Sequence, residues 1–156
     1  GGSNLIGMIH EFLDEPEIIK IGVEAAETAA LSNGTPGIMQ GMKTYMLQTA
    51  DGSKSLGGAS LGAGIQYFSV GPQHSFLKDQ GAVTYTSATD KEILEAYKLI
   101  ASTEGICSAL EPMAGAAELI KQAKNKPKDY LICLNLCGTG EKDLNTIQEH
   151  IGKDFE

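Results

Sequence analysis

Apolar residues recur at helical spacing in four segments of the chain, each with polar residues or glycine on the opposite face. The predicted helices cover residues 4–13, 89–103, 112–125 and 141–151. Thr89 and Glu92 form a capping box at the start of the second helix, and Gly105 suits its end. Pro112 suits the first turn of the third helix.

Short segments rich in β-branched residues lie between these helices and predict strands. They are residues 18–23, 83–86 and 130–136, of which the last is the strongest. Residues 32–42 are loop-like, residues 42–48 fit a strand or a helix, and the glycine-rich stretch 52–82 shows no periodic element. Strands alternating with helices predict an α/β fold with a mostly parallel sheet flanked by helices, in a single domain over residues 1–156.

The composition fits a globular domain and disfavours several classes of function. Of 156 residues, 42% are hydrophobic and 21% are charged, a balance that allows a sizeable core. The formal net charge of -8 disfavours binding to nucleic acid, which needs a basic surface. No apolar run reaches the ~18 residues of a membrane span, so no membrane contact is expected. Three scattered cysteines suit reduced thiols and predict a cytoplasmic protein.

Two glycine-rich turns precede predicted helices, where a parallel α/β sheet binds its ligands. Residues 1–4 lead directly into the first helix, and their amides and serine hydroxyl suit a phosphate group. The alternative for this turn is the remnant of a cloning tag followed by a helix cap. Residues 137–140 form either a ligand-binding turn or an ordinary connection between a strand and a helix.

Single residues offer weaker candidates for chemistry. Glu111 directly precedes the third helix and is the acid best placed for a pocket, with capping of that helix as the alternative. His10 is expected on a solvated helix face, and His74 is expected to stabilise a loop through a hydrogen bond. No spacing of serine, histidine and aspartate indicates a hydrolase triad.

Several blocks of sequence follow one another in an order that is specific to one enzyme family. They are residues 1–8 (GGSNLIGM), 21–26 (IGVEAA), 34–37 (GTPG), 41–43 (GMK), 48–52 (QTADG), 69–74 (SVGPQH), 103–106 (TEGI), 109–111 (ALE) and 135–143 (NLCGTGEKD). Over nearly the whole chain these blocks resemble the tryptophan synthase beta subunit family, which makes the first two glycines native residues.

This resemblance implies a pyridoxal 5′-phosphate enzyme of fold type II. Its reaction would be the β-replacement of the serine hydroxyl by indole, which gives L-tryptophan. The resemblance also implies a homodimer of beta chains, an alpha subunit as partner and a monovalent cation, Na⁺ or K⁺, in a cytoplasmic enzyme of tryptophan biosynthesis.

The same resemblance assigns roles to individual residues. The residues matched to cofactor binding are Gly1, Gly2, Ser3, Asn4, Gly64, Cys137 and Gly138. The first four match the loop around the phosphate, and Gly64 matches a glycine near the ring and the indole pocket. Cys137 matches a position, usually serine, that bonds the pyridine nitrogen. Glu111 matches the glutamate against the cofactor and is the expected catalytic residue. The backbone carbonyls of Tyr67 and Ser69 match ligands of the cation.

The chain also departs from the family pattern. Gln66, the expected substrate-binding residue, stands where an aspartate normally closes a salt bridge, and Thr139 replaces a basic residue. The Schiff-base lysine and an upstream glutamate have no match, so the chain is expected to be the C-terminal cofactor-binding portion of such an enzyme and inactive alone. Two alternatives stay open: another fold type II lyase, such as a serine dehydratase or cysteine synthase, and a non-catalytic subunit that binds a partner.

Overall fold

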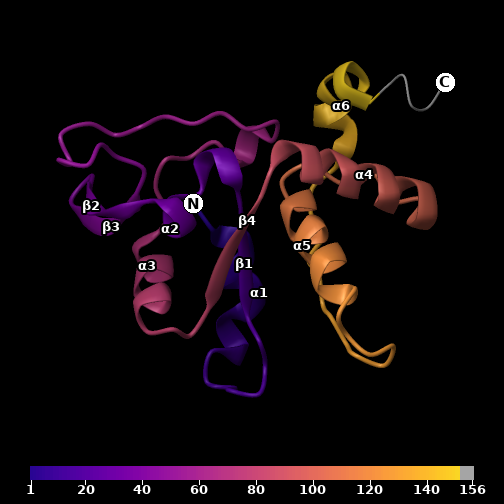
Figure 1. Ribbon diagram of the computed structural model, residues 1–156, viewed down its shortest axis with the longest axis horizontal. Coiled ribbons are helices and arrows are strands. Elements are labelled where there is room, and N and C mark those ends of the chain that lie inside the picture. The colour runs from indigo at the N-terminus through magenta and orange to yellow at the C-terminus, as the bar shows by residue number, and fades with distance from the viewer. Residues whose placement is uncertain (152–156) are drawn as a thin grey trace.

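A parallel pair of strands lies at the centre of the computed structural model, which describes residues 1–151 (Figure 1). The pair consists of β1 (Ile21–Ala25) and β4 (Thr84–Ala88), with Ile21 opposite Thr84 and Ala25 opposite Ala88. The connection between these strands runs over residues 26–83, which provides the long crossover that a parallel pairing requires. The predicted α/β fold with a parallel sheet is therefore confirmed.

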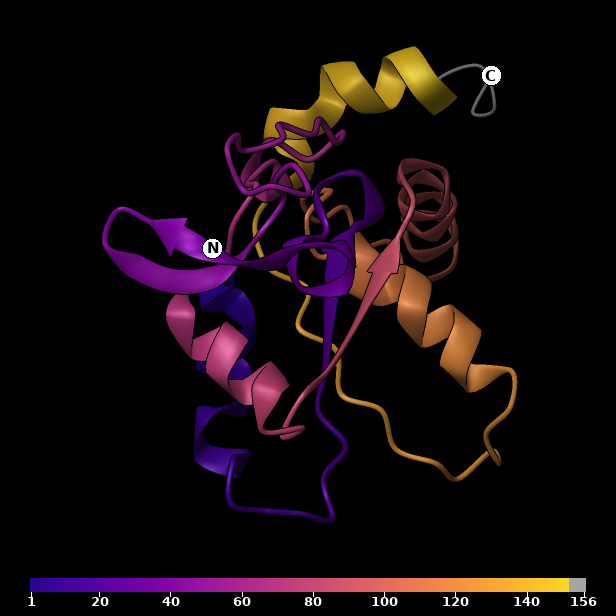
Figure 2. The ribbon, with the colours of Figure 1, turned by 60° about the vertical axis from the view of Figure 1, so that its left-hand side comes forward.

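Helices cover both faces of this pair, with α1 and α3 on one side and α4 and α5 on the other (Figures 1 and 2). The helices are α1 (Ser3–Ile9), α2 (Ala30–Asn33), α3 (Pro72–Asp79), α4 (Asp90–Glu104), α5 (Met113–Ala123) and α6 (Leu144–Ile151). A 3-10 turn continues α1, and a second one, η4 (Gly140–Asp143), precedes α6. Within residues 1–151 no helix combines the length and the hydropathy that crossing a bilayer demands.

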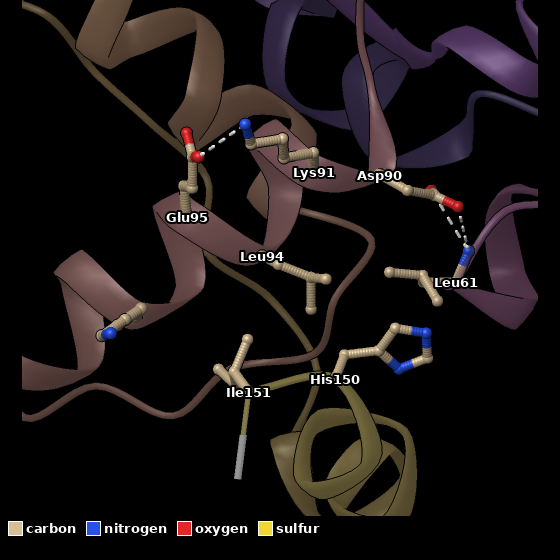
Figure 3. A pocket seen from close by; sticks show the side chains of 8 residues that line it. Leu61, Asp90, Lys91, Leu94, Glu95, His150 and Ile151 are labelled. Atoms are coloured by element: carbon tan, nitrogen blue, oxygen red, sulfur yellow. Dashed lines mark hydrogen bonds and ion pairs between the residues drawn. The ribbon is translucent and has the colours of Figure 1, made fainter. Parts of the chain in front are cut away.

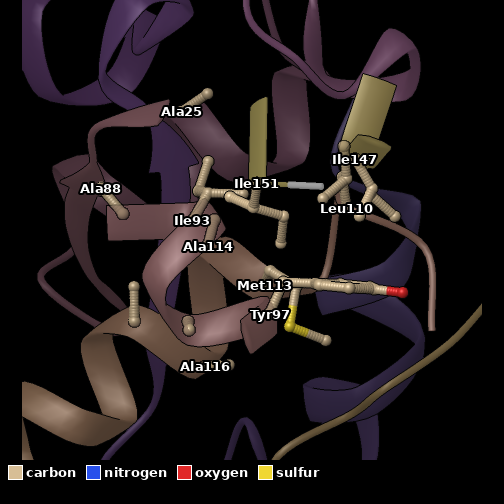
Figure 4. Packing of buried hydrophobic residues seen from close by; sticks show 12 residues of the cluster. Ala25, Ala88, Ile93, Tyr97, Leu110, Met113, Ala114, Ala116, Ile147 and Ile151 are labelled. Carbon is tan, nitrogen blue, oxygen red and sulfur yellow. The ribbon is translucent and has the colours of Figure 1, made fainter. Parts of the chain in front are cut away.

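Two clusters of buried side chains hold these layers together. The larger cluster joins Ala25 and Ala88 of the strands to α4, α5 and α6, and both Leu110 and Met113 in it are fully buried (Figure 4). The smaller cluster packs α1 and α3 against the other face of the sheet. Because both faces of the strands are covered, the strand residues carry no polar alternation.

Gly22 sets how closely α1 approaches the sheet. A Cβ atom at this position would lie 2.6 Å from Cδ2 of Leu5 and 2.7 Å from the Tyr85 ring. A side chain at position 22 would therefore push Leu5 or the Tyr85 ring away from the sheet. The first helix therefore packs directly on β1, which fixes the place of the chain's first residues.

The predicted helices agree with the structure, apart from shifts of a few residues at their ends. The capping box of α4 is formed: Glu92 N donates to Thr89 Oγ1 at 3.3 Å, and Thr89 N donates to Glu92 Oε2 at 2.8 Å. Gly105 ends this helix in the left-handed region with φ of 67°. The first strand begins three positions later than predicted, at Ile21.

The loop predicted over residues 32–42 is wrong. Residues 35–39 form β2 (Thr35–Met39), which pairs in an antiparallel hairpin with β3 (Met42–Met46). Gln40 and Gly41 join the two strands with positive φ angles of 48° and 81°, as a type I′ turn requires. The strand alternative for residues 42–48 is thereby confirmed, whereas α3 occupies a stretch without any predicted element.

The strand predicted over residues 130–136 is also wrong. Among the described residues no strand pairs with this segment. Its composition favours a strand, but strand formation depends on backbone hydrogen bonds to a neighbour. Leu134 and Leu136 pack against the larger cluster, while Leu131 is 89% exposed.

We expect the substitution Thr89→Ala to loosen the first turn of α4. The cap contributes about 1 kcal/mol, so amides of that turn should exchange with solvent roughly fivefold faster in the full-length protein. Lys91→Ala in the same turn is the control, because its ion pair with Glu95 spans 3.8 Å between highly exposed side chains. Equal exchange rates in the two variants would contradict a stabilising cap.

Candidate functional site

The backbone of residues 1–4 is held from behind by the start of α3. Gly71 N donates to the carbonyl of Gly1 at 3.0 Å, and His74 Nε2 lies 2.8 Å from the carbonyl of Gly2. In a planar trans peptide the carbonyl and the next N–H point in opposite directions. The amides of Gly2 and Ser3 are therefore turned away from α3. Gly2 occupies the N-cap of α1 with φ of 97° and no side-chain cap.

The buried side chain of His74 links the first residues of the chain to α3 and β4. It is 3% exposed, and its Nδ1 lies 2.9 Å from the Tyr85 hydroxyl. Because Nε2 faces a carbonyl it carries the ring proton, so Nδ1 accepts from Tyr85. Burial lowers the pKa of His74, which favours this neutral form. The structure thus gives His74 the stabilising hydrogen bond that its sequence context predicts.

Asn4 and Cys137, which are 133 positions apart in sequence, lie in direct contact. Asn4 Nδ2 donates to Cys137 Sγ at 2.9 Å, and both residues are exposed. Gly138 follows with φ of 72°, and a Cβ there would lie 2.9 Å from Cβ of Ala109. The structure therefore brings the glycine-rich turns at residues 1–4 and 137–140 to one place.

Glu111 lies between the loop of Gly64 and η4. Its Oε1 accepts from Gly64 N at 2.7 Å, and each carboxylate oxygen lies 2.9 Å from Lys142 Nζ. Partial burial opposes ionisation of Glu111, but the hydrogen bonds from Lys142 and Gly64 outweigh it and lower the pKa of this carboxyl group. Glu111 is therefore ionised at neutral pH. A Cβ at position 64 would lie 2.7 Å from Glu111 Oε1, so any side chain there would displace this carboxylate.

Two further residues, Lys142 and Asp143, hold Glu111, although the sequence pattern assigns them no role. Lys142 Nζ also bonds both oxygens of Asp143 at 2.8 Å, and Asp143, which is 5% exposed, accepts from Leu110 N at 2.9 Å. These two residues hold the side chain of Glu111 and the backbone before it. Their one sequence signal is that they end the block at 135–143.

The remaining predicted residues lie in the segment that follows Gly64. Gln66 Nε2 donates to the carbonyl of Ser60 at 2.6 Å, so its amide bonds within its own loop. Tyr67 is exposed and Ser69 is half-buried beside Met46 in β3. The substrate role of Gln66 and the cation role of the Tyr67 and Ser69 carbonyls stay predictions.

A separate hollow of about 580 Å³ lies between α4, α6 and Leu61 (Figure 3). Its lining residues are Leu61, Asp90, Lys91, Leu94, Glu95, Lys98, His150 and Ile151. None of the residues with a predicted role lines it. This hollow is therefore distinct from the place where the two glycine-rich turns meet.

Comparison with curated proteins relates the chain to one enzyme. It is 44% identical over 165 residues to the tryptophan synthase beta chain of Cereibacter sphaeroides, an alignment that covers 100% of this chain and 40% of that protein. The chain is homologous to tryptophan synthase beta chains. The same protein of Allorhizobium ampelinum is 45% identical over 160 residues, which are 97% of this chain and 39% of the relative. The chain thus spans about two fifths of the length of these beta chains.

Solved structures show the same fold relationship. Two structures of O-ureido-L-serine synthase match 93% of this chain with TM-scores of 0.59 and 0.57, at 15% and 17% identity. They cover 37% and 38% of those chains. The expected α/β arrangement of fold type II enzymes is confirmed for the part that this beta-chain homologue covers. No model of a known protein family matches the chain.

We expect Gly2→Ala to destabilise the protein by about 2–4 kcal/mol, from backbone strain and overpacking. The added Cβ would lie 2.1 Å from Nε2 of His74, and the φ of 97° is unfavourable for alanine. Gly7→Ala is the matched control, because its Cβ meets no heavy atom within 4 Å and a helix favours alanine. Chemical denaturation of the full-length protein measures the stability of both variants. Equal denaturation midpoints for the two variants would contradict the close contact of Gly2 with His74.

Proposed function

We propose that the protein, at its full encoded length, is a tryptophan synthase beta chain. It would be a pyridoxal-phosphate-dependent lyase that replaces the hydroxyl of L-serine with indole to form L-tryptophan. The observation that carries this proposal is the 44% identity over the whole chain to a tryptophan synthase beta chain. The contact between Asn4 and Cys137 supports it, because both residues were assigned to one cofactor from distant blocks.

The residues of the first turn fit the phosphate of this cofactor. The amides of Gly2 and Ser3 face away from α3, Ser3 adds a hydroxyl donor, and residues 1–8 carry no acidic side chain. A Cβ at Gly1 would meet no heavy atom within 4 Å, so the space at that position is open. A dianion gains from such converging donors.

Cys137 and Glu111 would act on the ring of the cofactor. When bound, pyridoxal phosphate withdraws electrons from the amino acid attached to it. The thiol of Cys137 is a weak, neutral hydrogen-bonding group for the pyridine nitrogen. Since Asn4 donates to its sulfur, the S–H proton is left to donate to a ligand. Glu111, held ionised beside Gly64, would supply a negative charge next to the reacting group.

The other expected components follow from the same proposal. The enzyme would be a cytoplasmic homodimer of beta chains that pairs with an alpha subunit. The carbonyls of Tyr67 and Ser69 would bind Na⁺ or K⁺, and Gln66 would lie at the substrate. Gln66 carries no charge, so closure over the substrate would lack the ion pair that an aspartate can form.

The direct test supplies the full-length protein with pyridoxal phosphate, L-serine and indole, with Na⁺ or K⁺ present. We expect L-tryptophan, detected by chromatography, and none when the cofactor is omitted. Pyruvate from serine without any tryptophan would indicate a dehydratase. Absence of both products, with no bound cofactor, would favour a non-catalytic subunit and overturn the proposal.

The second test concerns the group at the pyridine nitrogen. We expect Cys137→Ser to keep most of the tryptophan-forming activity, because a hydroxyl is also a neutral hydrogen-bonding group. Cys137→Asp should instead shift products towards transamination, because a carboxylate favours a protonated nitrogen and a stronger electron sink. Product ratios with serine and indole measure both variants. Unchanged ratios in Cys137→Asp would show that this side chain does not face the nitrogen.

A further inference from the structure

Lys142 joins three parts of the chain that are distant in sequence. Its Nζ lies 2.9 Å from both oxygens of Glu111 and 2.8 Å from both oxygens of Asp143. Oε1 of Glu111 also accepts from Gly64 N at 2.7 Å. One ammonium group therefore holds the acid that binds the backbone of the Gly64 loop.

The segment that carries Lys142 is attached to the Glu111 segment at several further points. Ser108 and Thr139 form an antiparallel bridge, and Gly140 N donates to the carbonyl of Cys107 at 3.0 Å. Asp143 accepts from the backbone of Leu110 at 2.9 Å. Residues 107–111 and 139–143 are joined along their length. The backbone therefore holds the Lys142 ammonium group at a fixed place beside Glu111.

Few ionisable side chains surround Glu111. Lys142 and Asp143 face it from η4, and the loop of residues 62–66 carries no ionisable side chain. The helix that follows Glu111 begins with Pro112 and Met113, which are also uncharged. Within residues 1–151 the ion pairs of Glu111 that the structure shows are those with Lys142. The side chain of Glu111 is 19% exposed, so loss of this cation would leave a mostly buried carboxylate without its counter-charge.

We propose that Lys142 is a positioning residue that keeps Glu111 ionised and bound to the Gly64 loop during the reaction. This inference rests on the proposed function, in which Glu111 and Gly64 lie beside the cofactor ring. Lys142 acts through Glu111 and need not touch the cofactor itself. Arginine preserves the charge at this position, whereas methionine preserves only the length of the side chain.

A matched ion pair elsewhere in the chain provides the control. Lys121 Nζ lies 2.9 Å from Glu92 Oε1, the same distance as in the Lys142 pair. That pair links α5 to α4, and its two side chains are 41% and 34% exposed. Lys121→Met therefore removes a lysine–glutamate contact of equal length without touching Glu111 or Gly64.

The experiment compares Lys142→Met, Lys142→Arg and Lys121→Met in the full-length protein. The first readout is amide hydrogen exchange of residues 62–66 without cofactor. We expect it to be about threefold faster or more in Lys142→Met only, because the Gly64 amide loses a fixed acceptor. The second readout is the pH dependence of the bound cofactor's absorbance. The pH midpoint of the absorbance change at acid pH should move upwards by about one unit in Lys142→Met. Such a shift corresponds to a tenfold rise in the proton affinity of Glu111.

Each outcome decides between the alternatives. Lys142→Arg should restore both readouts, and in a Glu111→Gln background Lys142→Met should change neither. If wild-type protein binds no pyridoxal phosphate, the proposed function fails, whatever the exchange data show. If it binds the cofactor and Lys142→Met matches Lys121→Met in both readouts, the role of Lys142 is refuted while the proposed function stands. If Lys142→Met does not fold, wild-type behaviour of Lys142→Gln in both readouts refutes it equally.

Discussion

The burial of the β1–β4 pair between two layers of helices is the constraint on which the rest of the arrangement depends. Helices that cover a parallel sheet run opposite to its strands, so their N-termini gather beyond the carboxyl ends of the strands. Gly22 lets α1 lie directly on the sheet, since a Cβ there would meet Leu5 and Tyr85. The two glycine-rich turns meet through the contact of Asn4 with Cys137, although they are separated by most of the chain.

Buried polar side chains near these two turns hold the backbone of the candidate site in place. His74 and Asp143 are 3% and 5% exposed, and each bonds a backbone group next to a predicted site residue. A buried polar group must have a hydrogen-bond partner, so each of these side chains fixes the distance between two segments. The exposed residues of the site, Asn4 and Cys137, thus sit on a backbone held from within.

The distribution of charge distinguishes two parts of the candidate site. The side chains of residues 1–4 carry no charge, whereas Glu111 and Lys142 concentrate charge near Gly64. Under the proposed function, a phosphate would lie in the first environment and a reacting amino group in the second. This separation agrees with the homology to tryptophan synthase beta chains, of which the chain spans about two fifths.

The helices over residues 4–13, 89–103 and 112–125 were predictable because their signals are local: apolar spacing, a capping box and glycine or proline at their ends. The blocks of sequence also indicated the homology to tryptophan synthase beta chains and singled out the residues of the two turns. Residues 130–136 were mistaken for a strand, because a strand exists only where another segment offers its backbone groups. Likewise Lys142 acquires its place only when η4 lies beside Glu111. Such contacts join segments far apart in sequence, so tertiary structure alone decided them.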